Sequence, residues 1–118
     1  MQKNPLNSGE QAVTISPVTG VSILNNKSFI RNGIAYLNIV FQKSSDFTSY
    51  ETIATVSPKP SDSSTNAYAS GAFADGSNIT KCALFGYVKS SDGSIVVTPQ
   101  SGVSNVRRVS FIATYIVE

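Results

Sequence analysis

The sequence lacks histidine and tryptophan altogether, and Cys82 is the single cysteine among its 118 residues. Without histidine, imidazole-based catalytic triads, zinc sites with imidazole ligands and histidine pH switches are excluded. A lone cysteine forms neither an internal disulfide nor a thiolate metal cluster. We therefore expect no metal and no cofactor.

Charge is also scarce, because only 14% of the residues are charged and the formal net charge is +2. The nine basic residues are scattered except for Arg107–Arg108, which is too little to follow a phosphate backbone. No run of 18 apolar residues could span a membrane as a helix, and the polar segment Met1–Gln11 does not resemble a secretory signal. These features predict no nucleic-acid partner and no membrane insertion.

What the chain does contain favours β-strands. Valine and isoleucine are plentiful, and their branched side chains favour strands over helices. Asn32-Gly33 between two strand-like runs is a strong hairpin signal, because both central residues of a type I′ turn need a positive φ. Ser91–Ser94 indicates a second hairpin turn. Alternation along Ile34–Gln42 predicts a core face of Ala35, Leu37, Ile39 and Phe41. In the last segment, one face is shared by Val109, Phe111, Ala113, Tyr115 and Val117.

No window has the 3.6-residue apolar period of a helix. Ser57–Ser77, rich in small residues and proline, is expected to be the longest irregular region. The expected strands are Ala12–Ser16, Val21–Leu24, Ser28–Arg31, Ile34–Gln42, Thr52–Ser57, Ile79–Lys89, Ser94–Thr98 and Val106–Val117. Several strands with turns between them predict an all-β fold, an antiparallel β-sandwich or jelly-roll-like barrel. Residues 12–118 would form the single domain, and residues 1–11 a linker or a start added by cloning.

The seven carboxylates give little sign of catalysis. Six of them lie in expected turns or at termini, and Glu51, at a strand start, has no evident partner. Glycosidic hydrolysis usually needs two carboxylates, and serine, threonine or cysteine nucleophiles need an activating base. Asp75–Asn78 has the oxygen-bearing side chains of a calcium loop but lacks its bidentate glutamate, so a plain turn is expected. We predict that the protein is not an enzyme; a depolymerase would require two acids that meet in space.

Two tyrosines differ from the other aromatic residues, because Tyr50 falls at a strand edge and Tyr68 in the long polar segment. An exposed ring can stack on a sugar face while neighbouring polar groups bind the sugar hydroxyls. A tyrosine that staples its own loop to the sheet is the alternative interpretation. The predicted saccharide-binding residues are Tyr50, Asn66, Tyr68, Asp75, Asn78 and Arg107.

Four motifs follow one another in order: Ile30–Ile39 with its Asn-Gly turn, Thr52–Pro60, Ser91–Ile95 and the closing Val109–Val117. This order resembles the C-terminal domain of tail-fibre, baseplate and receptor-binding proteins of phages that infect Gram-positive bacteria. Those domains commonly have an NG hairpin, an IATLP…P stretch, a DGxI turn and a closing F…xY strand. The resemblance covers Ala12–Val117.

The resemblance implies a β-sandwich or jelly-roll head that forms a homotrimer and binds a host cell-wall polysaccharide, often between subunits. It implies a virion protein of the distal tail or baseplate, made in the host cytoplasm and released by lysis. Other tail or baseplate proteins would be joined through an upstream region. The chain departs from the family in having no tryptophan and a short spacing from Pro58 to Pro60, so no binding residue is carried over. The alternative is a structural baseplate or tail-fibre domain that assembles without a ligand.

The closing strand itself favours an oligomer, because apolar residues occupy both of its faces. Phe111 and Tyr115 lie on one face, and Ile112 and Ile116 on the other. A sheet covered on one side only shows a cleaner alternation of apolar and polar residues. Either a position at the centre of the sandwich or a subunit interface would explain this pattern.

Overall fold

The protein folds into ten antiparallel strands in the computed structural model, which describes residues 9–62, 65–75, 82–101 and 106–117. The described residues contain no helix that is long and apolar enough to cross a membrane. The strands are β1 (Thr14–Pro17), β2 (Val21–Asn26), β3 (Phe29–Arg31), β4 (Ile34–Lys43), β5 (Glu51–Ser57), β6 (Ala67–Tyr68), β7 (Ser70–Asp75), β8 (Cys82–Val88), β9 (Ser94–Pro99) and β10 (Val106–Ile116). The predicted all-β class is confirmed.

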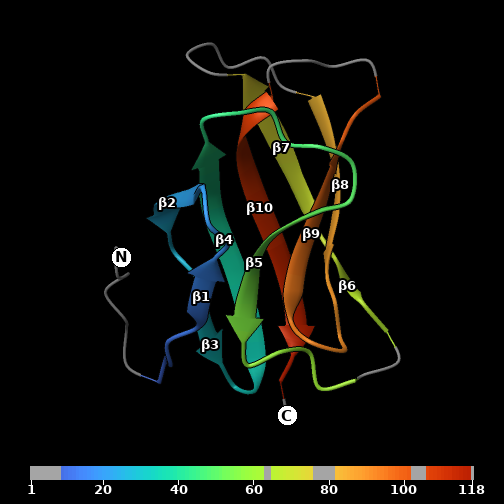
Figure 1. The fold of residues 1–118 in the computed structure, drawn as a ribbon. Coiled ribbons are helices and arrows are strands. Elements are labelled where there is room, and N and C mark those ends of the chain that lie inside the picture. The colour runs from blue at the N-terminus through green and yellow to red at the C-terminus, as the bar shows by residue number, and fades with distance from the viewer. Residues whose placement is uncertain (1–8, 63–64, 76–81, 102–105, 118) are drawn as a thin grey trace.

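One path of hydrogen-bonded pairs runs through the strands in the order β1-β5-β9-β8-β7-β10-β4-β2, with β3 beside β4 and β6 beside β8. This path folds back on itself to give two layers (Figure 1). The front sheet contains β1, β5, β9, β8 and β6, and the rear sheet contains β7, β10, β4, β2 and β3. β8 links the two sheets, because its first residues pair with β7 and its later residues pair with β9.

The two layers form a β-sandwich and do not close into a barrel. Among the described residues, β1 pairs with β5 alone and β2 with β4 alone, so the path has two free edges. The chain before β1 lies beside the rear sheet, where Gln11 exchanges two backbone hydrogen bonds of 2.8 Å with Ile30 of β3. It then crosses to pair with β5 in the front sheet. The last residue of the expected linker, Gln11, is therefore attached to the domain.

The predicted core face of β4 is confirmed, and one face of β10 belongs to the core as well. All four inward residues of β4 are at most 1% exposed, and the inward residues of β10 from Val109 to Tyr115 are buried as well. The register sets Phe41 opposite Val109 and Ile39 opposite Phe111, so cross-strand pairs of apolar side chains fill the centre of the sandwich. Residues of the front sheet close this core from the other side, namely Ile15, Ile53, Val56, Val88, Ile95 and Val97.

Tyr115 adds a hydrogen bond near the C-terminal end of β10. Its hydroxyl donates a hydrogen bond of 2.8 Å to the carbonyl oxygen of Pro58, in the segment that follows β5. Burial raises the pKa of the Tyr115 hydroxyl well above its usual range, because a phenolate is poorly solvated there. The hydroxyl thus remains a hydrogen-bond donor at all ordinary pH values and attaches β10 to the segment that follows β5.

Both predicted hairpin turns are present. Asn32 and Gly33 have φ angles of 53° and 74° between β3 and β4, as a type I′ turn requires. In the turn between β8 and β9, Gly93 has a φ of 79°, and the Asp92 carboxylate accepts a hydrogen bond of 2.9 Å from the backbone N–H of Ser94. This bond to the charged form lowers the pKa of Asp92.

The prediction that Ser57–Ser77 is irregular is wrong, because β6 and β7 lie within it. Their serine, glycine and alanine residues are weak strand formers by themselves. β7 nevertheless forms, because it pairs with β10 on one side and with β8 on the other. Of the expected strand Ile79–Lys89, residues 82–88 form β8, Lys89 follows its end, and residues 79–81 lie outside the described residues.

Two glycines with positive φ provide a matched test of the β8–β9 turn. At Gly93, an added Cβ would lie 2.5 Å from the carbonyl oxygen of Val56, whereas at Gly20, with a φ of +91°, it would meet nothing within 4 Å. We expect Gly20→Ala to lower the free energy of unfolding by about 1–2 kcal/mol through backbone strain alone. Gly93→Ala should cost at least about 1 kcal/mol more, since the neighbouring backbone must also shift. Urea denaturation measures both, and equal losses would contradict the close approach to Val56.

Candidate functional site

Four aromatic rings gather on the outer face of the front sheet, and we refer to Tyr50, Tyr68, Phe85 and Tyr87 together as the aromatic surface. Neighbouring ring centroids lie 5.9 to 6.2 Å apart, from Tyr50 to Phe85 and on to Tyr68 and Tyr87. Tyr50 and Tyr68 are each 64% exposed and Phe85 is 47% exposed. These rings are tilted or edge-on to one another, which is a favourable arrangement for aromatic pairs.

The alternation of β8 displays two of these rings. Gly86 and Val88 are buried on the core side of β8, so Phe85 and Tyr87 point to the opposite, outer face. Tyr68 of β6 lies directly opposite Tyr87 in the antiparallel register. On the other side of β8, Tyr87 pairs with Val96 of β9, which is buried although its neighbours Ile95 and Val97 already face the core. The outer face around Tyr87 is therefore a packed apolar layer.

Tyr50 comes to this surface from the loop that joins β4 to β5. Its backbone N–H donates a hydrogen bond of 2.8 Å to the hydroxyl oxygen of Thr98, and Thr98 lies opposite Phe85 in the pairing of β9 with β8. Tyr50 has a φ of 53°, a left-handed conformation that costs a residue with a bulky side chain about 1–3 kcal/mol. The ring is mostly exposed, so its burial does not repay this strain.

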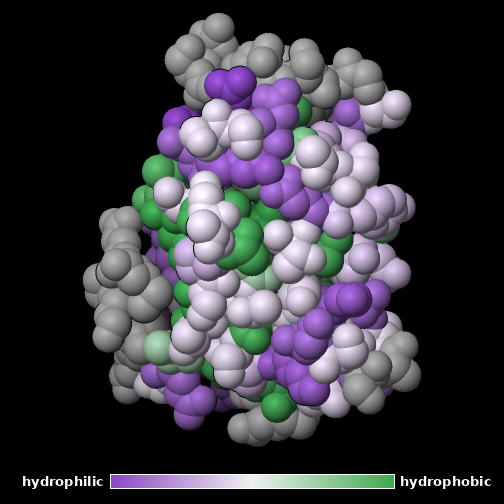
Figure 2. Space-filling model, in the orientation of Figure 1, coloured by the Kyte–Doolittle hydropathy of each residue, from purple (hydrophilic) through white to green (hydrophobic). Residues whose placement is uncertain are grey.

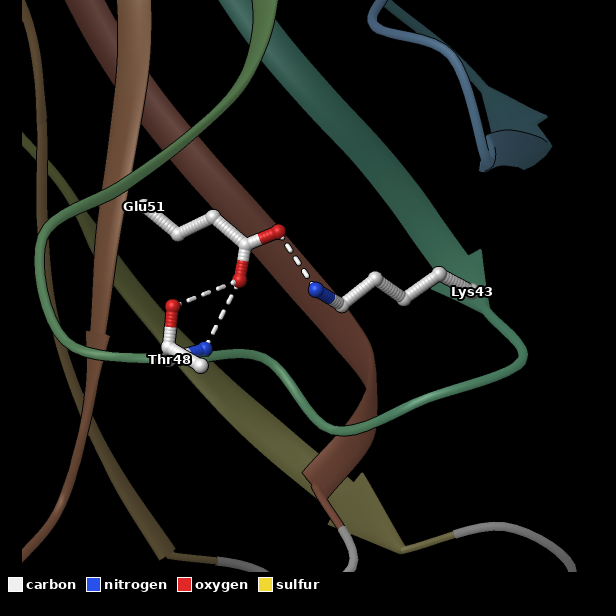
Figure 3. Close-up of polar contacts among 3 residues, drawn as sticks. All are labelled: Lys43, Thr48 and Glu51. Atoms are coloured by element: carbon white, nitrogen blue, oxygen red, sulfur yellow. Dashed lines mark hydrogen bonds and ion pairs between the residues drawn. The ribbon is translucent and has the colours of Figure 1, made fainter.

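Glu51 anchors the same loop on the side that faces β4 (Figure 3). One carboxylate oxygen accepts a hydrogen bond from Lys43 Nζ at 2.5 Å, and the other accepts from the backbone N–H and hydroxyl of Thr48 at 2.7 and 3.2 Å. The Lys43 and Glu51 side chains are only 14% and 19% exposed. Their ion pair is therefore screened less than a surface pair would be.

Beyond the rings and Val96, the face of the front sheet is polar and mostly uncharged. Figure 2 shows the face on which β1, β5 and β9 lie in front, and most of its atoms have a hydropathy near neutral. Strongly hydrophilic groups gather near the upper end and at the lower right of this view. On this face, β5 carries exposed hydroxyls at Thr52, Thr55 and Ser57. This face therefore presents hydroxyl groups on β5 and ring faces on β8, with β9 between them.

A cleft of about 630 Å³ lies apart from the aromatic surface, and none of the four rings lines it. It opens beside the pair β1–β5, and its walls include the hydroxyl residues Thr14, Ser16, Thr55, Ser57 and Ser61. Its charged residues are tied to the backbone of the β8–β9 turn, since Lys59 Nζ donates to the carbonyl oxygen of Ser91 at 3.0 Å and Asp92 accepts from Ser94. The cleft contains none of the predicted saccharide-binding residues.

The structure unites only part of the predicted set. Tyr50 and Tyr68 both contact the ring of Phe85. Asn66 has a structural role, because its side-chain oxygen accepts hydrogen bonds of 3.1 and 3.4 Å from the backbone N–H and hydroxyl of Ser90.

Of the remaining predicted residues, two belong to the rear sheet and one lies outside the described residues. Arg107 Nε forms an exposed ion pair of 3.0 Å with Asp46. Asp75 ends β7 and pairs in register with Val106, the residue before Arg107. Asn78 lies outside the described residues.

Phe85 and Tyr87 are not among the predicted saccharide-binding residues, because aromatic side chains in strands most often belong to the core. The signal that could have found them is the alternation Phe85-Gly86-Tyr87-Val88. Glycine and valine occupy one face of this strand and two aromatic rings the other, so only one of these faces can belong to the core.

Acidic and metal-ligating residues do not gather in the part of the chain that the structure describes. No group of three or more histidine, cysteine, aspartate or glutamate residues that could hold a metal ion occurs there. The buried polar residues of this part are Asn26, Ser28, Ser90 and Ser94, with no carboxylate among them.

The fold and the surface thus define an antiparallel β-sandwich that displays a cluster of exposed aromatic rings. No protein-family model matches the chain, and no curated protein or solved structure matches it. The aromatic surface is therefore the feature of this chain that bears most directly on function.

The exposure of Tyr68 predicts how little it contributes to stability. We expect Tyr68→Ala to lower the free energy of unfolding by no more than about 1 kcal/mol, the usual scale of a cross-strand aromatic pair on an open face. Phe111→Ala, which removes a fully buried ring, should cost about 3–5 kcal/mol. Urea denaturation compares the two variants. If the loss of stability in Tyr68→Ala approached that in Phe111→Ala, the main role of Tyr68 would be to hold its own segment to the sheet.

Proposed function

We propose that the protein is a non-enzymatic saccharide-binding domain, and that it serves as the receptor-binding head of a phage tail. The observation that carries the binding role is the aromatic surface of Tyr50, Tyr68, Phe85 and Tyr87. The phage setting rests on the order of the four sequence motifs. In this role the head recognises a host cell-wall polysaccharide from the distal tail or baseplate of the virion.

The aromatic surface suits a sugar because a pyranose ring has an apolar face of C–H groups and a rim of hydroxyls. Exposed aromatic rings can pack against the apolar face, and phenolic and threonine hydroxyls can exchange hydrogen bonds with the rim. Tyr50 and Tyr68 carry both kinds of group and are each 64% exposed. Tyr50, Tyr68 and Phe85 are exposed on an outer sheet face, which favours a long or repeating glycan over a small molecule enclosed in a pocket.

Two features of Tyr50 favour ligand binding over a purely structural role for the rings. A structural staple gains stability by burying its ring, and the ring of Tyr50 is mostly exposed. Its left-handed backbone would also suit asparagine or glycine better than tyrosine. A tyrosine at this position thus strains the backbone and gains little stability from burying its ring. A ligand that covers the ring would explain why a tyrosine occupies the position.

Substitution at Tyr68 tests the proposal. We expect Tyr68→Ala to weaken saccharide binding about tenfold, because stacked rings contribute roughly 1 kcal/mol or more, whereas Tyr68→Phe should retain most of the affinity. The isolated protein is first applied to an array of bacterial cell-wall saccharides, and a soluble form of a bound glycan is then titrated calorimetrically.

The control is Leu24→Ala, which removes an apolar side chain, 42% exposed, from β2 of the rear sheet, outside the pair β4–β10. The control should bind like the unaltered protein. Unchanged binding by Tyr68→Ala, or release of reducing ends from the polysaccharide, would count against a saccharide-binding domain without catalytic activity.

The second candidate function is a structural domain of the tail fibre or baseplate, and the outer face of the rear sheet favours it. Ile112 and Ile116 of β10 are 43% and 58% exposed. The register brings Ile116 opposite Ile34 and Thr114 opposite Tyr36, so an apolar strip follows the pair β4–β10. These isoleucines do not lie at the centre of the sandwich. Burial within the sandwich therefore does not explain why apolar residues occupy both faces of β10. An interface between copies of the chain in a homotrimer is the remaining explanation, and it would serve either function.

Light scattering tests the trimer. At micromolar concentration we expect a mass three times the chain mass of 12.5 kDa, and Ile116→Glu should reduce it to the mass of one chain, because a buried carboxylate without a partner is costly. Ile116 is mostly exposed within one chain, so the variant should still fold. A single-chain mass for the unaltered protein would contradict the trimer without bearing on the aromatic surface.

A further inference from the structure

The loop of residues 44–50 carries an exposed ring at its last position, and the backbone there is unusual. The described non-glycine residues with positive φ are Asn32 and Tyr50. Asn32 sits in a type I′ turn, where asparagine is a preferred residue. Tyr50 has no such preference, because left-handed conformations are uncommon for residues with bulky side chains. Contacts around Tyr50 must therefore hold its backbone in place.

Those contacts converge on the loop from both sheets. From the front sheet, the hydroxyl oxygen of Thr98 accepts the Tyr50 N–H at 2.8 Å. From the rear sheet, Lys43 at the end of β4 reaches the carboxylate of Glu51, which also accepts two hydrogen bonds from Thr48 (Figure 3). The carboxylate of Glu51 thus joins β4, the loop and β5 directly beside the strained residue.

A buried ring secures the middle of the loop. Phe47 is 4% exposed, and its backbone N–H donates a hydrogen bond of 2.8 Å to the carbonyl oxygen of Val106 in β10. Lys43 Nζ lies 5.0 Å from the centre of the Phe47 ring, close enough for a cation–π contact. The ammonium of Lys43 is thus shared between Phe47 and Glu51, and the loop has little freedom left before Tyr50.

We propose that Glu51 is a positioning residue that fixes the ring of Tyr50 against Phe85 before a ligand arrives. The inference rests on the proposed saccharide-binding function and adds to it the group that prepares the aromatic surface. A ring already held in its bound orientation loses less side-chain and loop freedom on binding, so the affinity rises without any new contact to the ligand. Glu51 itself contacts the loop and Lys43 and need not touch the sugar.

Nuclear magnetic resonance of the full chain tests the positioning without a ligand. We expect cross-relaxation between the rings of Tyr50 and Phe85 in the unaltered protein, and its loss in Glu51→Gln, which keeps the shape of the side chain but removes the charge that holds Lys43. Asp46→Asn is the matched control, since it removes the carboxylate that pairs with Arg107 from the same loop. The control should retain the cross-relaxation. Cross-relaxation between the two rings that persists in Glu51→Gln would overturn the proposal.

A double-mutant cycle on glycan affinity tests the consequence for binding. We expect Glu51→Gln to weaken binding of the array-selected glycan about three- to tenfold, and to have no further effect when Tyr50 is already alanine. An equal loss in the Tyr50→Ala background would overturn the proposal, because Glu51 would then act on some other part of the surface.

Two further results keep this test separate from that of the proposed function. If Glu51→Gln does not fold, Lys43→Met serves in its place, because it removes the ammonium that the Glu51 carboxylate binds. Loss of the ring contact and of affinity in Lys43→Met then supports positioning by Glu51, and retention of both overturns it. If the unaltered protein binds no saccharide, the proposed function fails, and the measurement of ring contacts still decides whether Glu51 positions Tyr50.

Discussion

The core and the aromatic surface depend on one constraint, the close approach of Phe111 to the backbone of β8 at Gly86. A Cβ at Gly86 would lie 3.0 Å from the carbonyl oxygen of Val96 and 3.2 Å from the ring of Phe111. The absent side chain leaves room for that ring in the centre of the sandwich. Phe85 and Tyr87, on either side of Gly86, must then face outward. A shift of β8 by one residue would bring both rings into the core and remove half of the surface.

Much of the fold follows from local sequence patterns. The Asn32-Gly33 turn and the alternation along β4 and β10 specify a hairpin and two long core strands, because turn geometry and strand period are properties of short segments. β7 has no comparable signal, since its residues are mostly small. Its hydrogen bonds come from β8 and β10, and this pairing between distant parts of the chain is invisible in any short window.

The candidate site was predictable only in part, for the same physical reason. Tyr50 was distinguished by its place at a strand edge, and Tyr68 by its place in a long polar segment. The roles of Asn66 and Arg107 depend on partners 24 and 61 residues away along the chain, which only the folded structure brings close.

The outer faces of the two sheets differ in character. The front sheet displays aromatic rings, and the rear sheet displays aliphatic side chains along β10, so association through the rear sheet would leave the rings accessible.

The two free strand edges have a consequence for how densely such molecules can be crowded. β1 is four residues long and ends in Pro17, which has no N–H to offer to a neighbouring strand. β2 at the opposite edge is interrupted by a bulge between Ile23 and Asn25, which twists its hydrogen-bonding groups out of line. Neither edge is a good template for adding strands from another molecule. At β1 and β2, copies packed side by side would therefore not extend the sheets into amyloid-like fibrils.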